Sequence, residues 1–179
     1  MCISLFSCKT NTNEIKNVAE DTGPVKKISE VFNNKKELFE DIKNIVLIYM
    51  EDNEDNWIYV SFNVSKNEFV NESYKIEQKP NLNVSNRERK SLEFKEDEYI
   101  KIKELFNIMI EYVDDKTEYP YMSIYTNTEN EVIAFTAQNE TYHQEIVYVT
   151  DEEMQIRLNE DEYENIEKDW YYKWSRYTQ

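Results

Sequence analysis

His143 is the only histidine of the chain and the side chain whose type most directly suggests catalysis. It lies in a polar segment between Glu140 and Glu145, in a loop or at the end of a strand. An imidazole beside a carboxylate can act as a general acid or base. However, no nucleophile occurs at a recognisable spacing, and an exposed loop histidine has the same local sequence. We therefore expect no catalytic residue and no enzymatic activity.

The sequence also argues against most metal and phosphate chemistry. A single histidine excludes sites built from several histidines, and the only glycine, Gly23, excludes a glycine-rich phosphate loop. The acidic run at residues 51–55 could bind Ca²⁺ weakly. It lacks the glycine turn and the distal glutamate of a calcium loop, so a solvated loop is expected there. We expect no metal and no cofactor.

Negative charge is the most prominent chemical property of the chain. It has 37 acidic and 21 basic residues, which give a formal net charge of −16. Nine of the acids lie between Asp151 and Asp169, where only Arg157 and Lys168 oppose them. Such acidity disfavours nucleic acid, whose phosphates need cationic contacts, and it favours and steers a basic protein partner. The alternative is that the charge only keeps the protein soluble.

The composition indicates one folded domain. The chain has 179 residues, of which 40% are hydrophobic and 14% aromatic, too apolar for a disordered acidic tail. Its tyrosines, phenylalanines and tryptophans can fill a sizeable core. No apolar run is long enough for a transmembrane helix. Cys2 and Cys8 both lie near the start, so no disulfide framework is expected in the body.

The first 24 residues are expected to form a flexible tail. The segment ending in Ser7-Cys8 resembles a bacterial lipobox, at which a signal peptide is cut and the new N-terminal cysteine, here Cys8, is lipidated. Only six residues precede Ser7 and none is basic, whereas a working signal has a basic region and a longer apolar region. Two alternatives stay open: a truncated lipoprotein signal with a tether, or a chance likeness with reduced cytosolic thiols.

Three amphipathic helices are expected. Apolar residues recur at spacings of three and four in residues 38–49 and 102–113. Residues 28–32 extend the first helix backwards, with Asn33-Asn34 as a break or N-cap. The third helix is expected after Asn159 as N-cap, with Glu162 at the capping-box position. Its apolar face would consist of Tyr163, Ile166, Trp170, Trp174 and Tyr177.

Alternating patterns predict short strands in two hairpins. Strands are expected at residues 57–64 and 68–77, at 91–94, at 121–126 and 131–136, and at 145–149. The polar, mildly basic residues 79–90 are expected to form a surface loop with Pro80. The sum is an α+β domain over residues 25–179, with a mostly antiparallel sheet and about three helices packed on one face.

This order of elements resembles that of the YezG-type immunity proteins, which are antitoxins of bacterial polymorphic toxins. The matching parts are an N-terminal helix, a Trp-led strand in a hairpin, a second helix, a second hairpin opened by an aromatic, and an acidic tail ending in a Trp-aromatic-Lys segment. Here, Tyr119 replaces the usual Trp of the second hairpin, whose turn lacks the expected Gly. In this sequence, the N-terminal helix corresponds to residues 38–49, the Trp-led strand to 57–60 and the second helix to 99–113. The second hairpin corresponds to residues 119–135, and the Trp-aromatic-Lys end to 167–174.

The resemblance implies a non-enzymatic inhibitor that neutralises a toxin, often a basic nuclease. We therefore expect an acidic immunity protein that occludes the cationic surface of its partner and binds no nucleic acid. It would be cytoplasmic, or in the periplasm or outer envelope if the lipobox is real. The alternative is a membrane-tethered envelope lipoprotein with a structural or ligand-binding role. The expected partner-binding residues are Asp52, Asp55, Trp57, Glu160, Asp161, Glu164 and Glu167.

Overall fold

The structure is a computed structural model that describes residues 24, 26–51, 57–63, 68–77, 86–112, 121–127 and 132–177. The predicted lipidation site Cys8 and the predicted partner-binding residues Asp52 and Asp55 lie outside these residues. The elements are α1 (Ile28–Glu51), β1 (Trp57–Asn63), β2 (Glu68–Glu77), β3 (Asn86–Ser91), α2 (Glu96–Ile110), β4 (Tyr121–Asn127), β5 (Val132–Gln138), β6 (Tyr142–Tyr148), α3 (Glu152–Glu160), β7 (Glu164–Glu167) and β8 (Trp170–Arg176).

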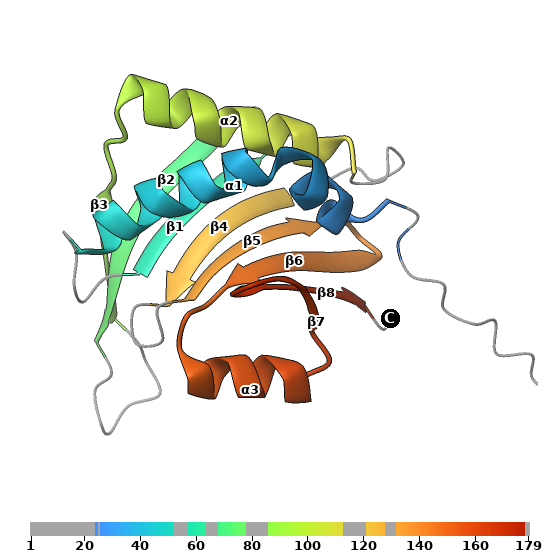
Figure 1. Ribbon diagram of the computed structural model, residues 1–179. Coiled ribbons are helices and arrows are strands. Elements are labelled where there is room, and N and C mark those ends of the chain that lie inside the picture. The colour runs from blue at the N-terminus through green and yellow to red at the C-terminus, as the bar shows by residue number, and fades with distance from the viewer. Residues whose placement is uncertain are drawn as a thin grey trace, which may run out of the picture.

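The eight strands form one sheet in the order β3-β2-β1-β4-β5-β6-β8-β7, and every neighbouring pair is antiparallel. The two predicted hairpins are the pairs β1–β2 and β4–β5. α1 and α2 lie side by side across one face of the curved sheet, whereas α3 lies on the other side (Figure 1). The predicted α+β class, the antiparallel sheet and the presence of three helices are confirmed.

The first helix has the break that its sequence predicts. α1 begins at Ile28, and its backbone leaves helical geometry at Lys35, with φ −133° and ψ 30°. This residue directly follows Asn33-Asn34, whose short polar side chains compete with the helix for backbone hydrogen bonds. The helix then continues to Glu51. Within the described residues, no helix is long and apolar enough to cross a membrane.

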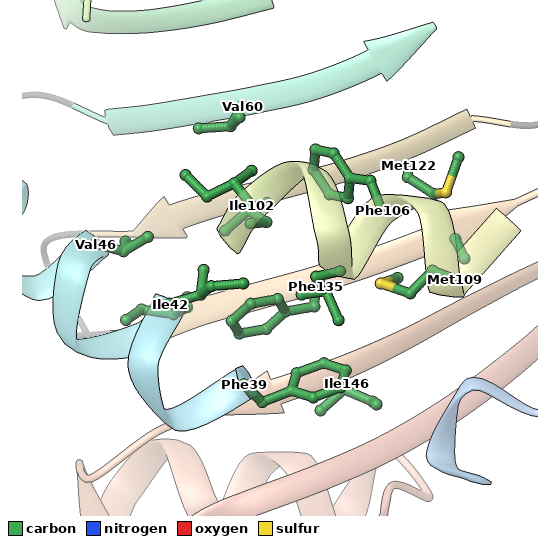
Figure 2. Packing of buried hydrophobic residues seen from close by; sticks show 14 of the residues in the cluster. Phe39, Ile42, Val46, Val60, Ile102, Phe106, Met109, Met122, Phe135 and Ile146 are labelled. Carbon is green, nitrogen blue, oxygen red and sulfur yellow. The ribbon is translucent and has the colours of Figure 1, made fainter. Parts of the chain in front are cut away.

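The main core lies between the two long helices and the sheet. Side chains from α1 and α2 point toward the strands, where Val60, Met122, Phe135 and Ile146 receive them (Figure 2). Trp170 of β8 closes one end of this core, with its ring centroid 5.0 Å from that of Phe32. Burial of these side chains removes apolar surface from water and supplies most of the favourable free energy of folding.

A second, smaller core lies on the opposite face of the sheet. Side chains alternate along a strand, so Ala134 and Val147 face away from the main core. There they pack with Val149, Leu158 of α3 and Tyr171. The expectation of all helices on one face is therefore corrected: α1 and α2 share a face, and α3 covers part of the other.

The C-terminal segment is the main correction to the predicted elements. The expected helix after Asn159 is absent; α3 ends at Glu160, and the β7–β8 hairpin follows. The N-cap is Asp151, whose carboxylate accepts the backbone N–H of Met154 at 2.8 Å. The aromatic residues of this segment fit both a helical and an alternating pattern. The segment forms a strand because its backbone pairs with the edge of β6, whose N–H and C=O groups would otherwise lack partners.

The third strand also differs from expectation. β3 covers Asn86–Ser91 and pairs with β2, so the predicted loop at residues 79–90 overlaps a strand. Of the predicted strand at 91–94, only Ser91 belongs to β3, and residues 92–94 lie in the connection to α2, where Leu92 is buried. Edge strands often carry charged side chains, because these discourage pairing of the free edge with another chain. Hydrophobic alternation is therefore a weak signal at this position.

Candidate functional site

Four of the acidic residues predicted to bind a partner lie within the described residues, on consecutive segments at one end of the sheet. Glu160 ends α3 and Asp161 caps it, while Glu164 and Glu167 lie on the edge strand β7. All four are exposed. In Figure 1, α3 lies below the sheet, and β7 is the edge strand next to β8. We call residues Glu160, Asp161, Glu162, Glu164 and Glu167 the acidic surface.

Few cations neutralise the acidic surface. Lys36 of α1 lies 3.1 Å from the Glu167 carboxylate, and both side chains are about half exposed. Arg157 of α3 is engaged with Glu153 at 2.6 Å. Within the part of the chain that the structure describes, no lysine or arginine forms an ion pair with Glu160, Asp161, Glu162 or Glu164. These carboxylates therefore project negative charge into solvent.

The backbone of the acidic surface is held in a defined turn. The N–H of Tyr163 donates to the carbonyl of Leu158, and the N–H of Glu162 donates to that of Asn159. These two bonds form a Schellman motif, which ends α3 with Glu162 in the left-handed region at φ 64°. The Nζ of Lys173 on β8 donates to the carbonyl oxygen of Asp161. The neighbouring sheet thus fixes where the acidic side chains begin.

Trp57 is placed far from the acidic surface. It is the first residue of β1, and four strands separate β1 from β7 in the sheet. At the usual spacing between strands, this corresponds to about 24 Å along the sheet. The structure brings together Glu160, Asp161, Glu164 and Glu167, and it does not bring Trp57 to them.

The aromatic residues of the C-terminal segment are core residues for the most part. Trp170 is 1% exposed, and its Nε1 donates to the Glu40 carboxylate of α1 at 2.9 Å. Tyr172 is likewise buried. Trp174 is half-buried and packs edge-on against Tyr142, with ring centroids 5.8 Å apart. Trp170 is therefore unavailable to a partner, and the exposed carboxylates are the groups that a partner could contact at this end of the sheet.

A buried cluster centred on Glu145 was not predicted. The Glu145 side chain on β6 is 12% exposed, and its carboxylate accepts hydrogen bonds from the hydroxyls of Tyr163 and, at 3.2 Å, of Tyr125. The Nε2 of His143 lies 3.9 Å away. We call Glu145, Tyr125 and Tyr163 the carboxylate cluster. It joins β4, β6 and the connection between α3 and β7.

The protonation state of Glu145 follows from these contacts. Burial alone would raise the pKa of Glu145, but His143 and the hydrogen bonds of the two tyrosines outweigh burial and lower it. Burial, followed by the nearby Glu145 charge, raises the pKa of Tyr125 and of Tyr163. The cluster at neutral pH is thus one carboxylate anion with two neutral hydroxyl donors.

Part of this cluster had a signal in the sequence. His143 and Glu145 are two residues apart, so the strand places them on the same face, as their proximity suggested. Glu140 instead lies exposed in the turn before β6. The two tyrosines are 20 and 18 residues away from Glu145 along the chain, and only sheet pairing and the fold of α3 bring them to it.

A shallow groove runs between the two long helices, on the side away from the sheet. It has a volume of about 600 Å³ and includes Lys35 at the kink of α1. Lys103 and Glu104 of α2 also line it, as does Glu111, which follows the last residue of that helix, and all three are exposed. The carboxylate cluster and the acidic surface lie elsewhere. Among the described residues, no group of three or more potential ligands could hold a metal ion.

Comparisons with known proteins add no relative. No model of a protein family matches the chain, and no curated protein and no solved structure matches it either. The resemblance to YezG-type immunity proteins therefore stays a hypothesis, based on the order of elements and on the residues that carry it.

Proposed function

We propose that this protein is a non-enzymatic binding protein of the immunity or inhibitor class, which neutralises a basic protein by covering its cationic surface. The observation that carries the proposal is the acidic surface, which lies on one turn and one edge strand. Among the residues that the structure describes, four of its exposed carboxylates form no ion pair, namely Glu160, Asp161, Glu162 and Glu164. The net charge of −16 acts in the same direction. The resemblance to YezG-type antitoxins supports the same class of function.

The physical mechanism is electrostatic capture followed by occlusion. A negative surface attracts a positively charged protein over roughly a Debye length and raises the rate of encounter. Once bound, the carboxylates pair with the lysines and arginines that a nuclease or another toxin uses on its own anionic substrate. Because the same cations cannot serve both, binding excludes the substrate.

The direct test is a pull-down from the native cell with two matched variants. The first replaces part of the acidic surface (E160Q/D161N/E164Q/E167Q). The second removes four exposed carboxylates elsewhere (E37Q/E104Q/E111Q/E140Q), so the change in net charge is equal. We expect a basic protein to be retained at low salt by the wild type and by the second variant, and to be lost with the first.

The retained protein must then lose its activity when the wild type is added in equal amount. Equal retention by all three proteins would show that total charge, and not the acidic surface, determines binding. Failure to retain any basic protein at low salt, or retention without inhibition, would contradict the proposed function.

The alternative function, a tethered envelope lipoprotein, is favoured by the lipobox-like segment before Cys8. It is tested by labelling cells with a radioactive fatty acid while they express the gene with its upstream region. Incorporation that Cys8→Ala abolishes would support the lipoprotein, and both functions could then hold together. No incorporation into the wild type would exclude the anchor.

A further inference from the structure

The segment from α3 to β7 is weakly attached to the rest of the fold by apolar contacts. Of the nine residues of α3, only Leu158 is buried, and Ile156 is 59% exposed. The second core that receives Leu158 contains five buried residues, far fewer than the main core. Segments with few buried apolar contacts open locally at a lower free energy than the whole protein unfolds. Polar contacts therefore matter more here than elsewhere.

Besides the backbone pairing of β7 with β8, three side chains among the described residues supply polar contacts that bridge this segment to the sheet. Tyr163 donates its hydroxyl hydrogen to Glu145 of β6, and Lys173 of β8 donates to the Asp161 carbonyl. The Nε2 of Gln155 donates to the Val149 carbonyl and to the carboxylate of Asp169. Of these bridges, the one to Glu145 is the only one whose acceptor is both a titratable carboxylate and largely buried.

The contacts of Glu145 link its charge state to the attachment of the α3–β7 segment. Among the described residues, its neighbours that carry or can carry charge are His143 on its own strand, Tyr125 on β4, Tyr163 on the α3–β7 connection, and Lys173 directly opposite on β8. The charge of Asp161 acts on Tyr163. Lys173 is occupied by the Asp161 carbonyl and lies over the ring of Tyr163, 5.1 Å from its centroid. Thus Glu145 of β6 and Lys173 of β8 both form hydrogen bonds with the turn that follows α3.

We infer that Glu145 and Tyr163 form a clamp that holds the α3–β7 segment against the sheet, and that protonation of Glu145 opens this segment while the main core stays folded. A charged acceptor makes a stronger hydrogen bond than a neutral one. The neutral acid therefore holds Tyr163 less well, and the small second core cannot keep α3 in place alone. Tyr163 is a positioning residue in this device, because it acts by fixing the turn that carries the acidic surface.

Hydrogen exchange of backbone amides tests the clamp without any partner. At neutral pH, we expect Tyr163→Phe to speed exchange in residues 154–164 by about tenfold, as loss of a hydrogen bond to a buried charge implies. The matched control is Tyr125→Phe, which removes the other hydroxyl donor to the same carboxylate but from β4. It should leave exchange in residues 154–164 within about twofold of the wild type.

The pH profile separates the clamp from a merely structural contact. Folding lowers the pKa of Glu145, so its stabilisation is present above the unfolded pKa and is lost as pH falls through the folded pKa, below 4.5. Protection of residues 154–164 in the wild type should fall in that range before protection of α1 and β5 does. Glu145→Gln should lack this early loss and should show weak protection already at neutral pH.

Two results would overturn the inference. One is equal exchange in residues 154–164 for Tyr163→Phe and Tyr125→Phe. The other is a wild type in which α3 and the main core lose protection together in acid. If Glu145→Gln does not fold, the comparison of the two tyrosine variants still decides. These measurements need no basic partner, so their outcome is independent of the proposed function.

Discussion

At the scale of single residues, the end of α3 shows how the chain manages with almost no glycine. The position after the helix cap adopts φ 64° and is occupied by Glu162, where glycine is strongly preferred because a Cβ is disfavoured in this conformation. Asp169, in the turn before β8, has φ 60°. Aspartate tolerates this conformation better than glutamate, since its short side chain can bond locally. Glu162 is therefore the more costly position.

We predict that Glu162→Gly stabilises the protein by about 1 kcal/mol, because it removes the cost of the left-handed conformation. The free energy of unfolding in urea measures this change. Glu162→Gln is the control, since it removes the same negative charge but keeps the Cβ. If the two variants are equally stable, relief of charge repulsion and not backbone conformation explains the gain.

At the scale of elements, the position of the third helix is decided by its cap. Asp151 accepts the N–H of Met154, and Glu152 and Glu153 add negative charge at the positive end of the helix dipole. The run Asp151-Glu152-Glu153 was visible in the sequence as part of the acidic cluster. Read as a helix start, it would have placed α3 correctly. Asn159, expected as the cap, instead lies in the last turn of α3.

Two alanine substitutions test whether Asp151 or Asn159 is the N-cap of the third helix. Asp151→Ala should destabilise the protein by about 1 kcal/mol through loss of the cap, whereas Asn159→Ala should change stability by less than about 0.5 kcal/mol. Chemical denaturation measures both. A larger loss for Asn159→Ala than for Asp151→Ala would mean that Asn159, and not Asp151, caps the helix.

At the scale of the whole molecule, negative charge opposes compactness. The chain carries −16, and its acids repel one another most where the acidic surface gathers them. The main core, with its aromatic contacts among Phe39, Phe135 and Trp170, must outweigh this repulsion. Binding a cationic partner would relieve the repulsion, so the same charge that weakens the free protein would favour the complex.

Salt should therefore stabilise the free protein. Raising NaCl from 10 to 150 mM shortens the screening length from about 30 Å to about 8 Å, and the urea midpoint should rise. The variant E160Q/D161N/E164Q/E167Q should start at a higher midpoint in low salt and gain less from added salt. A midpoint that falls with salt in the wild type would show that attractive ion pairs outweigh repulsion.

Local patterns were sufficient for much of this fold. The spacing of three and four in residues 38–49 and 102–113 predicts α1 and α2, because a single face of each helix packs on the sheet. The alternation of the two hairpins predicts β1, β2, β4 and β5. The break at Asn33-Asn34 was equally local. These features depend on neighbours within a few residues, which a sequence displays directly.

By itself, the sequence determined the α+β class, the paired hairpins, the concentration of acids near the C-terminus and the closeness of His143 to Glu145. Only the tertiary structure decided that residues 164–176 are strands, that α3 covers the second face, and that Tyr125 and Tyr163 meet at Glu145. The physical reason is the free edge of β6. Its unpaired backbone groups and the two buried faces beside it stabilise a strand whose aromatic spacing suits a helix equally well, and no local pattern reports an edge formed by distant residues.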